Sequence, residues 1–80
     1  SHSLQEAQNN IRRGTTSAKA ISNSIRQYFL GKEGCEIDYI SICDPESFKE
    51  KEQIRGRTLI ALAVKVGPSR LIDKCILEEF

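Results

Sequence analysis

The sequence predicts an α+β fold in which an N-terminal helical hairpin packs on a three-stranded, mainly antiparallel sheet. Two observations carry this prediction. Apolar residues recur every three or four positions up to Phe29, which is the period of an amphipathic helix, whereas after Ile37 the period falls to two and β-branched residues dominate. Glycine and proline separate the resulting segments. Because the chain has only 80 residues, we expect residues 1–80 to form a single domain.

Two helices are expected, near residues 3–13 and 16–30. The first carries Leu4, Ala7 and Ile11 on one face. The second carries an apolar stripe of Ala18, Ile21, Ile25, Tyr28 and Phe29. Hydroxyl side chains at 15–17 can cap its N-terminus, and a glycine follows each helix. The short connection between them predicts an antiparallel helical hairpin.

Three strands are expected, near residues 36–43, 57–66 and 69–76. The stretch EIDYISICD leads into Asp44-Pro45-Glu46, which is a type I turn signal. Gly67-Pro68 leaves only two residues between the second and third strands, which predicts a tight hairpin. Residues 46–55 form a charged connection, and we expect Phe48 and Ile54 to anchor it on the core.

The longest strand indicates which face of the sheet meets the helices. Its even positions carry the bulk, whereas its odd positions are Leu59, Ala61, Ala63 and Lys65. The even face should therefore be buried against the helices. The odd face is small and half apolar, which is unusual for a sheet that stands alone in water. We expect another surface to cover it, and in the isolated chain we expect its leucine and alanines to be more exposed than Ile60, Leu62 and Val64.

The composition argues against several classes of function. Twelve lysines and arginines stand against eleven aspartates and glutamates, so the net charge is +1 and no basic excess draws the chain to nucleic acid. Arg12, Arg13 and Arg26 are too few to change that balance. No apolar run of about 18 residues and no signal-peptide pattern is present, so we expect a cytoplasmic protein that does not enter a membrane.

The residue types that bind metals or phosphate do not form a recognisable motif. The spacing of Cys35, Cys43 and Cys75 matches neither a zinc ribbon nor a C-x-x-C pair, so we expect reduced, partly buried thiols. His2 is the only histidine. The stretch LGKEG at 30–34 follows a helix rather than opening one, so the helix dipole has the wrong sign for phosphate. We expect no catalytic residue, metal site or cofactor in this chain alone.

Three stretches, taken together, resemble a known family. They are DYISICDPESF at 38–48, IRGRTLIALAVKVGPSRLID at 54–73, and an upstream helix that ends in IRRG. In this order and spacing they are similar to the C-terminal domain of the pantothenate synthetases, or pantoate-β-alanine ligases. The resemblance covers nearly the whole chain.

The resemblance implies a two-domain parent enzyme in which a nucleotide-binding N-terminal domain precedes this smaller lid domain. Family members activate pantoate with ATP and magnesium as a pantoyl-adenylate, release pyrophosphate, and let β-alanine displace AMP. They typically form homodimers through the N-terminal domain. The H-x-G-H and Met-Ser-Ser-Arg segments that hold ATP in the family do not occur in this chain. The 80-residue chain alone is therefore expected to be inactive.

The charged residues beside the Gly67-Pro68 turn are the candidate site. If the domain is a lid, Lys65, Arg70 and Asp73 are candidates for the surface that closes over ATP and pantoate and excludes water from the adenylate. Alternatively, these residues are cross-strand pairs or solvated strand ends. Family members usually have Asn where this chain has Lys74, so no role is carried over to that position.

A second class of function fits the same fold without the missing domain. A free-standing α+β module can bind a protein segment on an open sheet face or edge, without catalysis. The discriminating observation is the coding sequence upstream of Ser1. About 180 preceding residues that include H-x-G-H would favour the ligase, and a start codon near Ser1 would favour the module.

Overall fold

In the structure, a computed structural model that describes residues 2–78, the two helices form the hairpin that the sequence predicts. Helix α1 spans His2–Arg12 and helix α2 spans Ala18–Phe29, within two residues of the expected bounds. Ser17 caps α2, because its Oγ accepts a hydrogen bond from the Ala20 backbone N–H at 3.2 Å. Neither helix has the length and apolar character needed to cross a membrane.

The sheet contains three strands in the order β1-β2-β3, and both pairs are antiparallel. Strand β1 spans Cys35–Cys43, β2 spans Thr58–Val66 and β3 spans Ser69–Leu77. Gly67 and Pro68 join β2 to β3, and Gly67 has a φ of 57°. A positive φ at the first central position is required by a type II′ turn, and glycine adopts it at little cost.

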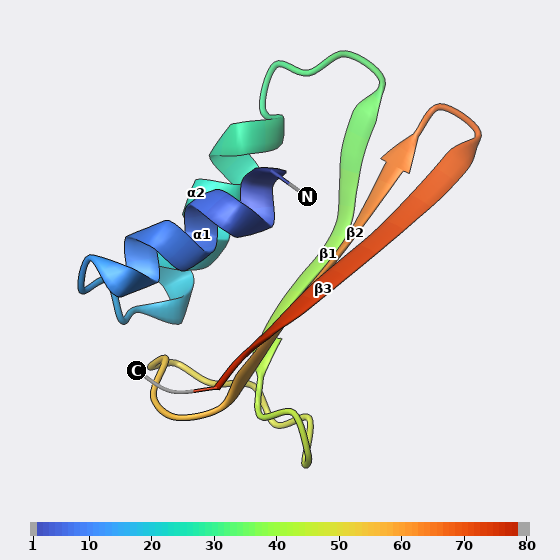
Figure 1. The fold of residues 1–80 in the computed structure, drawn as a ribbon. Coiled ribbons are helices and arrows are strands. Elements are labelled where there is room, and N and C mark those ends of the chain that lie inside the picture. Colours follow the sequence, from blue (N-terminus) through green and yellow to red (C-terminus); the bar gives the residue numbers. More distant parts are fainter. Residues whose placement is uncertain (1, 79–80) are drawn as a thin grey trace.

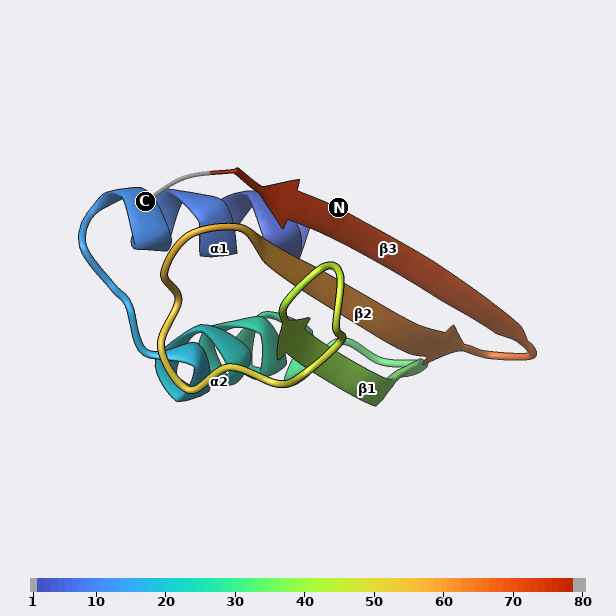
Figure 2. The same cartoon turned by 90° about the horizontal axis from the view of Figure 1, so that it is seen from below.

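Both helices cover the same face of the sheet, which leaves the other face without a helical layer (Figure 1). The view in Figure 2 shows the β2–β3 hairpin running past the ends of the helices. The core lies between the layers, where Ile60, Leu62 and Val64 are buried together with Ile21 and Ile25. The predicted burial of the even face of β2 is therefore confirmed.

The connection between β1 and β2 returns to the helical hairpin. The Ile54 backbone N–H donates to the Thr16 carbonyl at 2.7 Å, and the Ala18 N–H donates to the Glu52 carbonyl at 3.0 Å. Ile54 is fully buried, as expected. The expectation for Phe48 is wrong, because its side chain is 68% exposed. Phe48 lies in the reversal closed by the Asp44 N–H to Lys49 carbonyl hydrogen bond, and its φ of 61° is uncommon for a residue other than glycine.

Lys51 fixes the end of this connection. Its Nζ donates to the backbone carbonyls of Arg55 at 2.7 Å and Arg57 at 2.6 Å, and to Oγ1 of Thr58 at 3.2 Å. The Thr58 hydroxyl in turn donates to the Gly56 carbonyl at 3.2 Å, and Thr58 is fully buried. One ammonium group thus satisfies the polar atoms where the chain bends into β2.

We expect Lys51→Met to lower the free energy of unfolding by about 1 to 2 kcal/mol, because three acceptors lose a charged donor and solvent replaces it only in part. Urea unfolding of the 80-residue chain measures this change. The matched control is Lys49→Met, at an exposed position two residues away, which should change stability by no more than about 0.5 kcal/mol. Equal effects of the two substitutions would contradict the role of Lys51.

Candidate functional site

The sheet face turned away from the helices is the first candidate surface, and we call it the open face. Cross-strand partners in a sheet share a face, so the registers identify its members. They are Glu36, Tyr39, Ser41 and Cys43 of β1, Leu59, Ala61, Ala63 and Lys65 of β2, and Arg70, Ile72, Lys74 and Ile76 of β3. Tyr39, Ile72 and Ile76 are exposed although they are large and apolar.

A β-bulge in β1 places a carboxylate within reach of Arg70. The register of β1 against β2 shifts between Ile37 and Tyr39, so Asp38 is the extra residue of the bulge. Its Oδ2 accepts a hydrogen bond from Arg70 Nε at 3.0 Å. Since Asp38 lies on β1 and Arg70 on β3, the side chains bridge the central strand, a span of about 10 Å between strand axes.

Tyr39 lies beside this ion pair. The guanidinium carbon of Arg70 is 5.8 Å from the centroid of the Tyr39 ring, which is within the range of a cation–π contact. The aromatic ring and the carboxylate therefore hold the Arg70 guanidinium from two sides.

The exposure of Ala63 differs from the expectation. Leu59 and Ala61 are partly exposed, as expected, but Ala63 is 0% exposed. Its cross-strand partners are Tyr39 and Ile72, and both are large. A methyl group between two such side chains is covered by them, so the prediction was wrong for this residue.

The three predicted site residues do not share one face. Lys65 pairs in register with Arg70, so both lie at the same end of the open face. Asp73 pairs with Leu62 and therefore lies on the face that meets the helices. The structure brings Lys65 and Arg70 together and separates Asp73 from them. Whether any of the three contributes to a lid stays a prediction.

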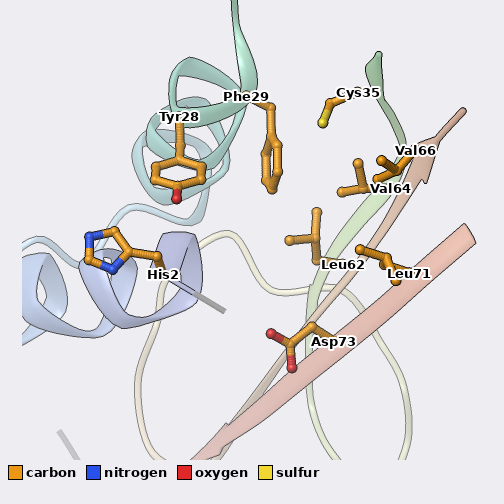
Figure 3. A pocket seen from close by; sticks show the side chains of 9 residues that line it. All are labelled: His2, Tyr28, Phe29, Cys35, Leu62, Val64, Val66, Leu71 and Asp73. Carbon is orange, nitrogen blue, oxygen red and sulfur yellow. The ribbon is translucent and has the colours of Figure 1, made fainter. Parts of the chain in front are cut away.

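Asp73 instead borders a cavity of about 330 Å³ between the helical layer and the projecting hairpin. Figure 3 shows Phe29 of α2 facing Leu62 and Val64 across this cavity. The lining also includes His2, Tyr28, Cys35, Val66 and Leu71. Apolar side chains dominate the walls, and the polar groups lie toward one end, so the cavity resembles a gap between diverging layers more than a catalytic cleft.

Residues 2–78 contain no metal-binding cluster, and the thiol of Cys75 is not activated. Among residues 2–78 there is no group of three or more His, Cys, Asp or Glu side chains that could hold a metal ion. All three cysteines are free. Burial raises the pKa of the Cys75 thiol, and the nearby Asp73 carboxylate raises it further. A thiol with a raised pKa stays protonated and is a poor nucleophile.

The loop at 44–49 is fixed by its own carboxylate. Asp44 Oδ1 accepts hydrogen bonds from the backbone N–H groups of Ser47 and Glu46, each at 2.9 Å. These bonds, with that to Ser47 first, hold the pKa of Asp44 below its usual value of 3.8. Phe48 is therefore exposed to solvent on a loop whose backbone is held by hydrogen bonds to Asp44.

The sequence pattern does not mark Asp38 and Tyr39 as residues of the candidate surface. Both belong to the stretch that carries the family resemblance, but nothing in the alternating pattern marks the bulge. A one-residue bulge changes which side chains share a face, and only strand pairing reveals it.

The fold and its open face define a small α+β domain whose exposed sheet face suits contact with another protein surface. The chain matches the family model described as pantoate-beta-alanine ligase over residues 1–76. This chain therefore belongs to the pantoate-β-alanine ligase family.

Curated relatives point to the same family. The chain is 46% identical over 77 residues to the pantothenate synthetase of Desulfatibacillum aliphaticivorans, which covers 96% of this chain and 27% of that protein. It is 40% identical over 78 residues to the pantothenate synthetase of Acetivibrio thermocellus, covering 98% of this chain and 28% of the relative. The chain is 43% identical over 76 residues to the pantothenate synthetase of Desulfitobacterium hafniense, and the match covers 95% of this chain and 27% of that protein. The chain thus spans about a quarter of the length of these relatives.

We expect the Asp44 carboxyl to titrate with a midpoint below 3.8, because two backbone N–H groups stabilise its ionised form. Since the folded pKa is the lower one, the stabilisation is complete above the unfolded pKa and is lost as the pH falls through the folded pKa. Carboxyl-carbon NMR on the 80-residue chain measures the midpoint. In Asp44→Asn the loop should lose this pH dependence, and a wild-type midpoint at or above 3.8 would contradict the assignment.

Proposed function

We propose that this chain is the C-terminal lid domain of an ATP-dependent ligase. The ligase condenses pantoate with β-alanine through a pantoyl-adenylate and gives pantothenate, AMP and pyrophosphate. The observation that carries this proposal is the difference between the share of this chain that is matched and the share of each relative that is matched. Nearly the whole chain matches proteins named pantothenate synthetase, yet it spans only about a quarter of their length. A domain that is one part of such an enzyme can assist the reaction without containing the reacting groups.

The residues of this chain fit a lid better than a catalytic centre. An acyl-adenylate is hydrolysed by water, so an enzyme that forms one gains from a domain that closes over the site. Lys65 and Arg70 sit at one end of the open face, so a domain that closes through this face carries both side chains to the closing surface. Asp73, on the other face, can contribute only by positioning the hairpin.

ATP and magnesium belong to the parent enzyme in this proposal. No side-chain cluster among residues 2–78 fits a metal ion, so we assign no residue of this domain to the metal and derive no step through it. The nucleotide would bind to the N-terminal domain of the same polypeptide, which is the main partner of this domain. By the same resemblance the parent is a cytoplasmic homodimer.

The second candidate function is a free-standing interaction module without catalysis. The exposed Tyr39, Ile72 and Ile76 on the open face support this alternative as well, because they suit any protein partner. The length of the natural gene product separates the two proposals. A polypeptide close to the length of the relatives favours the ligase, and one that begins near Ser1 favours the module.

We expect the purified 80-residue chain to catalyse no pantoate-dependent exchange of pyrophosphate into ATP and to bind ATP no more tightly than about 1 mM. The physical reason is that the chain offers no phosphate-binding loop and no metal cluster within residues 2–78. Titration calorimetry and an exchange assay measure both properties. Micromolar ATP binding by this chain would contradict the proposal that the N-terminal domain binds the nucleotide.

In the full-length ligase, we expect Lys65→Ala or Arg70→Ala to lower turnover by about 10-fold or less, because a lid orders and dehydrates the site without performing the chemical step. Each substitution should change the free energy of unfolding by no more than about 1 kcal/mol, since both side chains are substantially exposed. Steady-state kinetics and thermal melting of each variant test this. Unchanged turnover in both variants would reject a role in the lid and would indicate that the two residues are solvated strand ends.

A further inference from the structure

Two adjacent residues of β3 show that exposed apolar surface occurs on both sides of the projecting hairpin. Ile72 is 61% exposed and Leu71 is 60% exposed. Ile72 lies on the open face beside Ala63, whereas Leu71 lies on the helix side opposite Val64 and borders the cavity. Leu71 therefore has an apolar wall of its own domain next to it, but Ile72 has only the sheet surface. The open face is the one that lacks a covering layer.

Arg70 distinguishes the open face from an ordinary apolar patch. Its Nε is held by Asp38 and its guanidinium lies near the Tyr39 ring, so the group is oriented before any partner arrives. Within residues 2–78, its two Nη nitrogens have no hydrogen-bond partner. An oriented guanidinium with a free Nη edge can bind a carboxylate with two hydrogen bonds.

The charges of the open face nearly balance within the domain. The face carries three cations, Lys65, Arg70 and Lys74, and two carboxylates, Glu36 and the bulge residue Asp38. Glu36 is the cross-strand partner of Lys65, and Asp38 is paired with Arg70. The carboxylate on the partner surface is therefore inferred from the free Nη edge of Arg70 and not from the net charge of the face.

We propose that Arg70, Tyr39 and Ile72 form the hot spot through which this domain docks on the remaining three quarters of the parent ligase, and that Arg70 receives a carboxylate of that surface. The inference rests on the proposed function, because the occupant is the rest of the same enzyme. The coverage of the relatives supplies this occupant, since a quarter-length domain has a far larger partner within one polypeptide. Tyrosine, arginine and a large aliphatic side chain in contact are typical of the energetic centre of an interface.

The direct test compares side-chain reactivity in two proteins. Hydroxyl-radical footprinting is performed on the 80-residue chain, with its fold checked by circular dichroism, and on the full-length enzyme without substrates. Docking through the open face should protect Tyr39 and Ile72 in the full-length enzyme and leave Leu71 as reactive as in the isolated chain. The proposal would be overturned if neither Ile72 nor Leu71 were protected, or if Leu71 were protected and Ile72 were not.

Matched substitutions in the full-length enzyme test the hot spot. Arg70→Gln is paired with Arg57→Gln, because Arg57 has nearly the same exposure, 47% against 48%, and an Nε–carboxylate bond of 3.1 Å to Glu78. Arg57 also pairs with Glu46 at 3.4 Å, so its substitution removes at least as many charge contacts as that of Arg70. Ile72→Ser is paired with Leu71→Ser, which removes equal apolar surface from the other face. The open-face variants should raise the rate of proteolytic cleavage between the domains by about tenfold, and the controls should not. Equal cleavage within each pair would overturn the proposal.

The two hypotheses fail in different ways. A full-length enzyme that makes no pantothenate but protects Tyr39 and Ile72 would reject the proposed function and leave the docking surface in place. An active ligase whose open face is as reactive as that of the isolated chain would reject the docking surface and keep the function. The footprint is therefore independent of catalysis.

Discussion

The burial of one face of β2 against the two helices is the interaction on which the rest of the structure depends. β2 is the central strand, so its backbone is paired on both sides by β1 and β3. Its residues Ile60, Leu62 and Val64 meet Ile21 and Ile25 in the core. Burying one large aliphatic side chain contributes roughly 1.5 to 3 kcal/mol, and these five side chains belong to one hydrophobic core cluster. The side-chain period of two then sends every odd residue of β2 to the opposite face.

The open face follows directly from that constraint. A single helical hairpin covers only one side of a three-stranded sheet, so the other side keeps its small central residues and its exposed Tyr39, Ile72 and Ile76. The bulge at Asp38 adds an ordered arginine to this surface. An uncovered sheet face with an oriented cation suits contact with another protein surface. The chain belongs to the pantoate-β-alanine ligase family and spans about a quarter of the length of its curated relatives.

Two charged side chains hold the loops that flank the sheet. Loops are the segments of a protein most prone to open locally. Lys51 binds the carbonyls that precede β2, and Asp44 binds the backbone of the 44–49 loop. Both devices use a charged side chain to satisfy backbone groups that have no strand partner. The β1–β2 connection as a whole is joined to the helical hairpin by two backbone hydrogen bonds, from Ile54 N–H to the Thr16 carbonyl and from Ala18 N–H to the Glu52 carbonyl.

The sequence by itself determined the helices, the strands, the hairpin at Gly67-Pro68 and the buried face of β2, because each depends on local periodicity and turn chemistry. It also identified Lys65 and Arg70 as neighbours across a two-residue turn. Only the tertiary structure decided the bulge at Asp38, the burial of Ala63 and the exposure of Phe48. The same holds for the separation of Asp73 from the open face. The exposure of Phe48 follows from the reversal of the 44–49 loop. The other features depend on which residues of different strands lie opposite one another, and strand register is a property of the assembled sheet that no single segment encodes.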